Sequence, residues 1–183
     1  MIIYALAILL SIVLIWLANY YFDKKNGIGF WITSILGVLP TSIIAGVRNL
    51  SIGTDIQHYV ITNFSAALTY NNLYQYLAFI HTIKTNYVGT VNHTEIGYSI
   101  LTYSVSRLSS NVHWLLFALQ FATVLFIYVS LVRYSREHKI SIVFGMFVYY
   151  MLFYGQSLNL MRQTLAASIV LFAVSYLMEN KFL

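Results

Sequence analysis

Long apolar runs separated by short polar clusters dominate the pattern of the chain. The runs cover residues 2–21, 28–47, 112–132, 140–156 and 158–178. A helix needs about 20 mainly apolar residues to cross the hydrocarbon core of a bilayer, and the run at 140–156 is short for this. The pattern therefore predicts an all-α polytopic membrane protein with about five transmembrane helices.

The region between the second and third runs, residues 48–110, has a more polar pattern. A Thr-x-x-Gln capping box places an N-cap at Thr54, and apolar residues then recur at helical spacing over 56–68. A second short helix fits 72–83. The apolar segment 96–109 would be only about 21 Å long as a helix, against the ~30 Å needed to cross. We expect short helices that lie along the membrane interface or re-enter it.

Composition supports a single membrane domain over 1–183. Sixty per cent of the residues are hydrophobic and 8% are charged, whereas soluble domains carry about 25% charged residues. The ten Lys and Arg residues form no stripe, which argues against nucleic acid. Absence of cysteine excludes disulfides, and the histidine spacing predicts no metal site, so His58 and His93 are interpreted as interfacial polar residues. Because no polar tail follows the last run, the chain is interpreted as incomplete at its C-terminus.

The basic residues alternate between the two sides of the predicted membrane. One side receives Lys24, Lys25, Arg133, Arg136, Lys139 and Lys181, and the other receives Arg48, Lys84, Arg107 and Arg162. The first group lies in short flanks, which the positive-inside rule assigns to the cytoplasm. The N-terminus and the 48–110 region are then external.

Two arginines on the external side are candidates for anion binding. Arg48 follows the last apolar turn of the second run, and Arg162, beside Gln163, lies about one turn inside the last run. A guanidinium offers planar, permanently charged donors suited to phosphate. The alternative is that each arginine snorkels to the lipid headgroups. Both lie close enough to the end of an apolar run for this.

Two acids on the same side are candidates for proton transfer. Asp55 follows Gly53, which can supply a tight turn, and Glu95 begins the apolar segment at 96–109. The alternative is that both acids merely stabilise the first turn of a helix. Tyr59 and Tyr98, close to these acids, are weaker candidates for contacts with a sugar ring.

Three short runs resemble the EpsG family, which comprises Wzy-like polymerases of exopolysaccharide and O-antigen biosynthesis. The first is Ala45-Gly46-Val47-Arg48, which leads into Ile52-Gly53-Thr54-Asp55 and Tyr59. The second is Glu95-Ile96-Gly97-Tyr98-Ser99-Ile100-Leu101. The third is Asn159-Leu160-Met161-Arg162-Gln163-Thr164-Leu165-Ala166-Ala167-Ser168-Ile169. Each run is weak alone, but their order, spacing and shared side of the membrane make the combination more specific.

The resemblance implies a glycosyltransferase that joins undecaprenyl-diphosphate-linked oligosaccharide repeats on the outer face of the bacterial cytoplasmic membrane, without a cofactor. Arg48 and Arg162, assisted by Gln163, would then bind and neutralise the diphosphate. Asp55 or Glu95 would act as the general base, and the other would organise an arginine. The expected partners are the lipid-linked substrate, membrane lipid and other assembly proteins such as a flippase or a chain-length regulator.

Three alternatives to a polymerase remain open. A flippase or transporter for the lipid-linked glycan also needs cations for diphosphate, but the apolar runs carry few polar residues at mid-membrane depth. An external acyltransferase typically needs a catalytic histidine, and neither His58 nor His93 has an evident partner. A non-catalytic subunit of an exopolysaccharide assembly system is the third alternative.

Overall fold

The computed structural model describes residues 2–86, 95–138 and 140–177, and its regular elements in these ranges are helices. The elements are α1 (Ile2–Asp23), α2 (Gly27–Val47), a π-helical turn η1 (Ile56–Val60), α3 (Ile61–Thr69), α4 (Leu73–Asn86), α5 (Ile96–Leu108), α6 (His113–His138), α7 (Ile142–Leu152), α8 (Tyr154–Asn159) and α9 (Met161–Leu177). The predicted all-α class is therefore confirmed.

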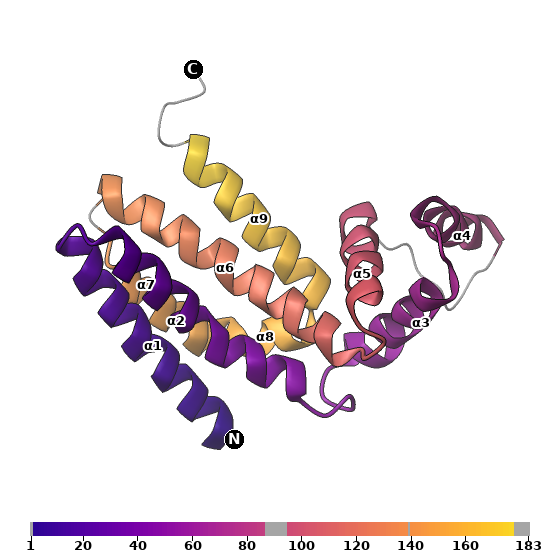
Figure 1. Ribbon diagram of the computed structural model, residues 1–183, viewed down its shortest axis with the longest axis horizontal. Helices are drawn as coiled ribbons and strands as arrows, with labels where there is room; N and C mark the ends of the chain where they lie inside the picture. Colours follow the sequence, from indigo (N-terminus) through magenta and orange to yellow (C-terminus); the bar gives the residue numbers. More distant parts are fainter. Residues whose placement is uncertain (1, 87–94, 139, 178–183) are drawn as a thin grey trace.

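The long helices form one bundle, in which helices far apart in the sequence also pack together. α1 packs on α2, α2 on α6, and α6 on α9, while α7 contacts both α1 and α6 (Figure 1). A tight reversal joins the first two helices: the Lys25 N–H donates to the Phe22 carbonyl at 3.0 Å, and the Asn26 N–H to the Tyr21 carbonyl at 3.0 Å. The Asn26 side chain then caps α2 by accepting from the Gly29 N–H.

Within the described ranges, three helices are long and apolar enough to cross a membrane by length and composition. They are α1, α2 and the His113–Arg136 part of α6. The prediction of one helix over 140–156 was wrong, because α7 ends at Leu152 and α8 begins at Tyr154 after a break at Phe153. With 11 residues, α7 extends about 16 Å. α9, with 17 residues, is the second shorter apolar helix.

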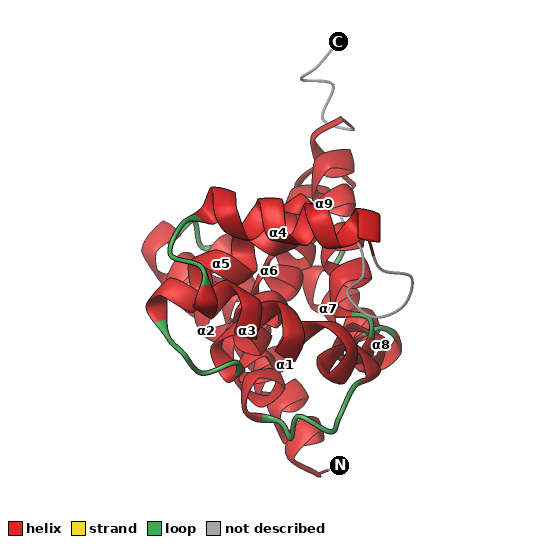
Figure 2. Ribbon diagram, turned by 90° about the vertical axis from the view of Figure 1, so that its right-hand side faces the viewer, coloured by secondary structure: helices red, strands yellow, loops and turns green. Residues whose placement is uncertain are grey.

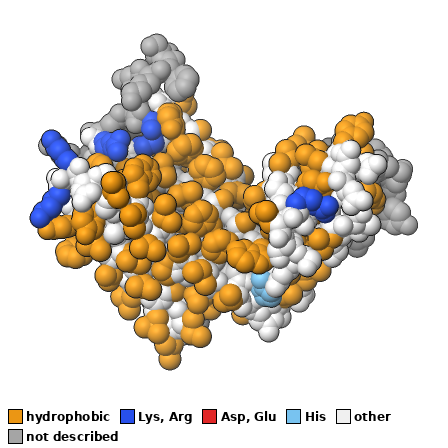
Figure 3. Space-filling view, in the orientation of Figure 1, with side chains coloured by type: hydrophobic (Ala, Val, Ile, Leu, Met, Phe, Trp, Pro, Cys, Tyr) orange, Lys and Arg blue, Asp and Glu red, His pale blue; other side chains and the backbone are white. Residues whose placement is uncertain are grey.

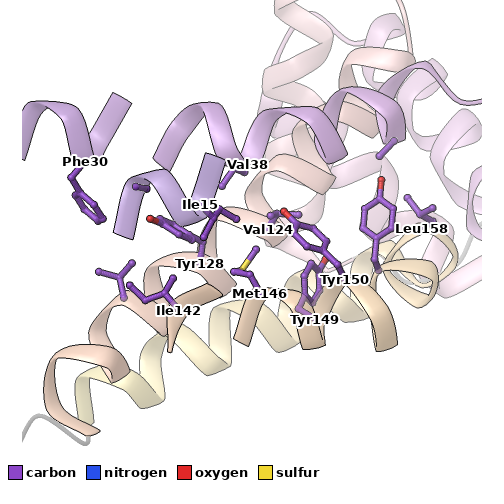
Figure 4. Packing of buried hydrophobic residues seen from close by; sticks show 14 residues of the cluster. Ile15, Phe30, Val38, Val124, Tyr128, Ile142, Met146, Tyr149, Tyr150 and Leu158 are labelled. Atoms are coloured by element: carbon purple, nitrogen blue, oxygen red, sulfur yellow. The ribbon is translucent and has the colours of Figure 1, made fainter. Parts of the chain in front are cut away.

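The centre of the bundle is a continuous apolar core. Ile15 of α1, Val38 of α2, Tyr128 of α6 and Met146 of α7 meet there (Figure 4). Gly37 allows the close approach of α1 and α2, because a Cβ atom at this position would lie 2.8 Å from the Ile15 Cγ1. A larger residue at position 37 would separate the two helices.

Several polar side chains inside the bundle are hydrogen-bonded to one another or to backbone carbonyls. The Ser34 and Tyr128 hydroxyls lie 2.7 Å apart, and the Tyr154 hydroxyl donates to the Thr41 carbonyl at 2.7 Å. In a bilayer, polar groups without such partners are costly, so these bonds join the helices. The bundle interior thus holds more polar side chains than the apolar runs indicated, and their hydrogen bonds contribute to helix packing.

The elements η1, α3, α4 and α5 form an arm that projects from one end of the bundle. In Figure 2, which looks at the molecule from the arm side, α4 lies nearest the viewer. α3 and α4 both pack on α5, around the buried side chains of Ala67, Tyr76 and Ile80. Arg107 of α5 donates to the Ala67 carbonyl at 2.6 Å, which ties α5 to the end of α3.

The three short helices predicted in the arm are confirmed within a few residues. The N-cap was misplaced by one position, since Thr54 is already helical and Gly53 precedes it. A π-helical turn follows at once, which the Thr-x-x-Gln pattern does not reveal. How the arm sits relative to the membrane surface remains a prediction.

The surface of the bundle is apolar along its length and basic at one end. Figure 3 shows Lys and Arg side chains gathered at the end where α1 turns into α2 and α6 finishes. These side chains include Lys24, Lys25, Arg133 and Arg136. Arg48 and Arg162 lie at the other end, where the arm begins (Figure 1). The two groups of basic residues are thus separated by the length of the bundle, as the sequence predicts.

Candidate functional site

Arg162 lies in the first turn of α9, directly after the chain breaks from helical geometry at Leu160. Its Nη1 contacts the Glu95 Oε2 at 3.3 Å, across 67 positions of sequence. The guanidinium carbon also lies 4.2 Å from the centre of the Tyr59 ring and 5.9 Å from that of Tyr98. Stacking of this kind holds a guanidinium in place and leaves its edges available for hydrogen bonds.

The two partners of this ion pair differ in their accessibility. The Arg162 side chain is 16% exposed and that of Glu95 is 67% exposed. An ion pair with one partner so exposed contributes at most about 1 kcal/mol to stability. The arrangement therefore does little for folding, whereas it does place an accessible carboxylate beside a fixed cation.

Arg48 forms the C-cap of α2 and is almost fully buried, with 5% of the residue exposed. Its Nη2 donates to the Met161 sulfur at 3.1 Å. Among the described residues, its Nε and Nη1 are buried and find no hydrogen-bond acceptor. Burial lowers the pKa of the Arg48 guanidinium below its ordinary value, and Asp55 acts in the opposite direction. This cation costs folding free energy unless an anion joins it.

A glycine turn holds the segment between Arg48 and Asp55 against the start of α9. Gly53 has a φ of +112°, a conformation that favours glycine. A Cβ atom at Gly53 would lie 2.9 Å from the carbonyl oxygen of Leu158, at the end of α8. The turn therefore packs directly on the backbone that leads to Met161 and Arg162. Tight packing at this point fixes the distance between the two arginine-bearing segments.

Replacing Gly53 by alanine is expected to loosen this contact. The left-handed backbone and the clash with Leu158 together are expected to lower the free energy of unfolding by about 1–3 kcal/mol. Thermal unfolding in detergent measures the loss. Gly155→Ala is the matched control, because a Cβ atom at this helical glycine meets nothing within 4 Å. Equal melting temperatures for the two variants would contradict the positioning role of Gly53.

The other residues predicted from the sequence lie around the two arginines. Asp55 is half-buried and lies within electrostatic range of Arg48 and Tyr98. Tyr98 is 4% exposed, and burial raises its pKa to about 12, so its phenol stays neutral. Gln163 is exposed, next to Arg162. The structure thus brings Arg162, Glu95, Tyr59 and Tyr98 together, with Arg48 joined to them through Met161. The His58 side chain and His93 lie outside the described residues.

Sequence reasoning missed the surroundings of Arg48. Met161 supplies its hydrogen-bond acceptor, and Tyr4 and Tyr154 interact with it electrostatically. Met161 precedes Arg162 in the third resembling run, so its position was a usable signal. Tyr4 and Tyr154 carry no such signal, because both look like ordinary aromatic residues of apolar helices.

One known protein family has a model that matches most of the chain. The EpsG family model matches residues 30–183, which include most of α2, the arm and all of the candidate site residues. The chain belongs to the EpsG family. Searches of curated proteins and of solved structures find no significant match. Membership of the EpsG family indicates a polymerase-type membrane enzyme of exopolysaccharide biosynthesis.

Proposed function

We propose that this EpsG-family protein joins undecaprenyl-diphosphate-linked oligosaccharide repeats on the outer face of the cytoplasmic membrane, with its N-terminus external. The observation that carries the proposal is the pair of arginines at the end of the bundle away from the basic cluster. Arg48 has two buried donors that lack acceptors among the described residues, and Arg162 is stacked on an aromatic ring. Such an arrangement suits a diphosphate leaving group.

The proposed reaction is a displacement at the anomeric carbon of the donor sugar. The hydroxyl oxygen of an acceptor repeat forms the new glycosidic bond, and the bond from the anomeric carbon to the phosphate oxygen breaks. The diphosphate leaves on its polyprenyl carrier with the bonding electrons. Arg48 and Arg162, with Gln163 assisting, stabilise the negative charge that develops on this leaving group. Because the site lies at the end of apolar helices, the carrier tail remains in lipid.

Glu95 is the proposed general base, and Asp55 is proposed to organise the arginines. Glu95 is two-thirds exposed, so an acceptor hydroxyl can reach its carboxylate. Asp55 is half-buried and interacts with Arg48, which suits a role in holding that cation in place. Tyr59 and Tyr98 are proposed to hold the Arg162 guanidinium in place. Tyr59, which is half-buried, is also proposed to contact the sugars, whereas Tyr98 is too buried to reach them.

Chain extension in vitro from purified lipid-linked repeats tests the proposed activity directly. Full-length protein in liposomes is expected to convert single repeats into longer lipid-linked chains, with release of the polyprenyl diphosphate. Gel electrophoresis of the lipid-linked products resolves each added repeat. Failure to extend with a competent substrate, or movement of the substrate across the bilayer instead, would favour an assembly subunit or a flippase.

Glu95→Gln is expected to lower the turnover number by about 10²–10⁴-fold, because the amide cannot accept the acceptor's proton. Asp55→Asn is the matched comparison, and its effect is expected mainly in the KM for the donor. A normal turnover number in Glu95→Gln would transfer the role of base to another group.

A further inference from the structure

A pocket with a volume of about 580 Å³ lies at the basic end of the bundle, away from Arg48 and Arg162. It is formed by the turn between α1 and α2 and by the end of α6. Its lining includes the side chains of Lys25, Asn26, Phe30, Trp31 and Arg136. None of these residues takes part in the proposed glycosyl transfer.

The described lining of this pocket carries an excess of positive charge. Lys25 and Arg136 contribute two cations, and the guanidinium carbon of Arg136 lies 5.4 Å from the centre of the Phe22 ring. The acid in the lining is Asp23, whose Oδ2 accepts from the Asn19 side chain at 3.4 Å. The pocket is therefore suited to a ligand with at least one negative charge.

The backbone at Lys25 is a second, independent observation. Its φ of 57° lies in the left-handed region, and its N–H closes the end of α1 by donating to the Phe22 carbonyl. Glycine is the usual residue at this position of a helix end, because a side chain is disfavoured in that conformation. Lysine at this position is less favourable for the backbone than glycine, but its side chain supplies a cation to the pocket. Strained positions of this kind tend to occur where a side chain has a function.

The pocket combines these cations with aromatic side chains at the end of two membrane-spanning helices. Phe30 is 4% exposed, whereas Trp31 is 54% exposed. Tryptophan near a helix end sits at the level of the lipid headgroups. A ligand bound here therefore has an anionic group for Lys25 and Arg136 and an apolar part that continues along Trp31 into the bilayer.

We propose that this pocket binds the phosphodiester headgroup of an anionic phospholipid from the surrounding leaflet. Basic pockets between spanning helices on the cytoplasmic side recognise anionic headgroups in this way. Asn26, which also lines the pocket, can add amide donors. The proposal does not depend on the activity at the opposite end of the bundle.

Lipid titration of the purified full chain in detergent, followed by native mass spectrometry, tests the proposal. Phosphatidylglycerol is expected to bind at least several-fold more tightly than phosphatidylcholine. Lys25→Gly and Arg136→Gln are each expected to weaken phosphatidylglycerol binding about five-fold, which corresponds to ~1 kcal/mol for one basic residue near an anionic surface. Lys24→Gln is the matched control, because it removes the same charge from a residue that does not line the pocket. The Lys24 Nζ instead lies 4.6 Å from the centre of the Tyr20 ring. The effect of Lys24→Gln is expected to be below two-fold.

Thermal unfolding separates loss of the ligand from loss of the fold. Lys25→Gly is expected to keep or raise the melting temperature in lipid-free detergent, because glycine suits the left-handed backbone. If this variant fails to fold, Lys25→Asn replaces it, since asparagine also tolerates that conformation. Three results would overturn the proposal. The first is an equal loss of phosphatidylglycerol binding in Lys24→Gln, and the second is equal binding of phosphatidylglycerol and phosphatidylcholine. The third is displacement of the bound lipid by an equal concentration of inorganic phosphate.

Discussion

Replacing Arg162 by alanine is expected to stop polymer formation and to leave lipid-linked single repeats to accumulate. Arg162 contacts the Glu95 carboxylate at 3.3 Å and stacks on Tyr59, so its loss removes a fixed cation and the partner of the proposed base. Loss of one preorganised group that stabilises developing charge lowers turnover by about 10²–10³-fold. Initial rates of chain extension in liposomes measure the effect, and the lipid-linked products of intact cells identify the accumulated intermediate.

Two variants control for the removal of an arginine from this side of the membrane. Arg107→Ala deletes an arginine of α5 that stacks on Tyr103, 4.7 Å from the ring centre, and donates to the arm backbone. Polymer formation is expected to persist in this variant. Arg162→Lys keeps the charge but loses the planar, stacked donors, so an intermediate rate is expected. Polymer of normal length in Arg162→Ala would refute a role for this residue in the reaction.

The helices that hold this site follow from the sequence to different degrees. A run of about 20 apolar residues can satisfy its backbone in a bilayer only as a helix, which is why α1, α2 and α6 were predictable. The break at Phe153 was not predictable from the continuous apolar pattern around it. Hydrogen bonds to distant helices follow directly after the break: the Tyr154 hydroxyl donates to the Thr41 carbonyl, and the Gln120 amide donates to the Ser157 hydroxyl.

In the candidate site too, some features follow from the local sequence and others depend on how the helices pack. The positive-inside pattern predicts that Arg48, Asp55, Glu95 and Arg162 share one side of the membrane, and the turn at Gly53 was predicted from its residue type. No periodic pattern relates Glu95 to Arg162, which are 67 positions apart. Their contact is set by how the start of α5 lies against the start of α9. The burial of Arg48 against Met161 is likewise a consequence of helix packing.

Replacing Arg48 by methionine is expected to stabilise the protein and to abolish its activity. The buried guanidinium has one acceptor, the Met161 sulfur, and two donors without acceptors in the described part of the chain. An apolar side chain of similar length removes this desolvated charge, which is expected to raise the free energy of unfolding by about 1–3 kcal/mol. The same change removes a proposed diphosphate ligand, so chain extension is expected to fall by at least ~10²-fold.

A gain in stability together with a loss of activity in Arg48→Met distinguishes a binding residue from a structural one. If Arg48 were structural, methionine would lower the melting temperature in detergent, and the loss of activity would follow from unfolding. Arg48→Lys is the matched control, because it retains a buried charge and is expected to give no gain in stability. Addition of a polyprenyl diphosphate should raise the melting temperature of the wild type more than that of Arg48→Met, because the variant keeps Arg162 but lacks the buried donors of Arg48. An equal shift in both proteins would place the diphosphate elsewhere and leave the buried cation without the role assigned to it.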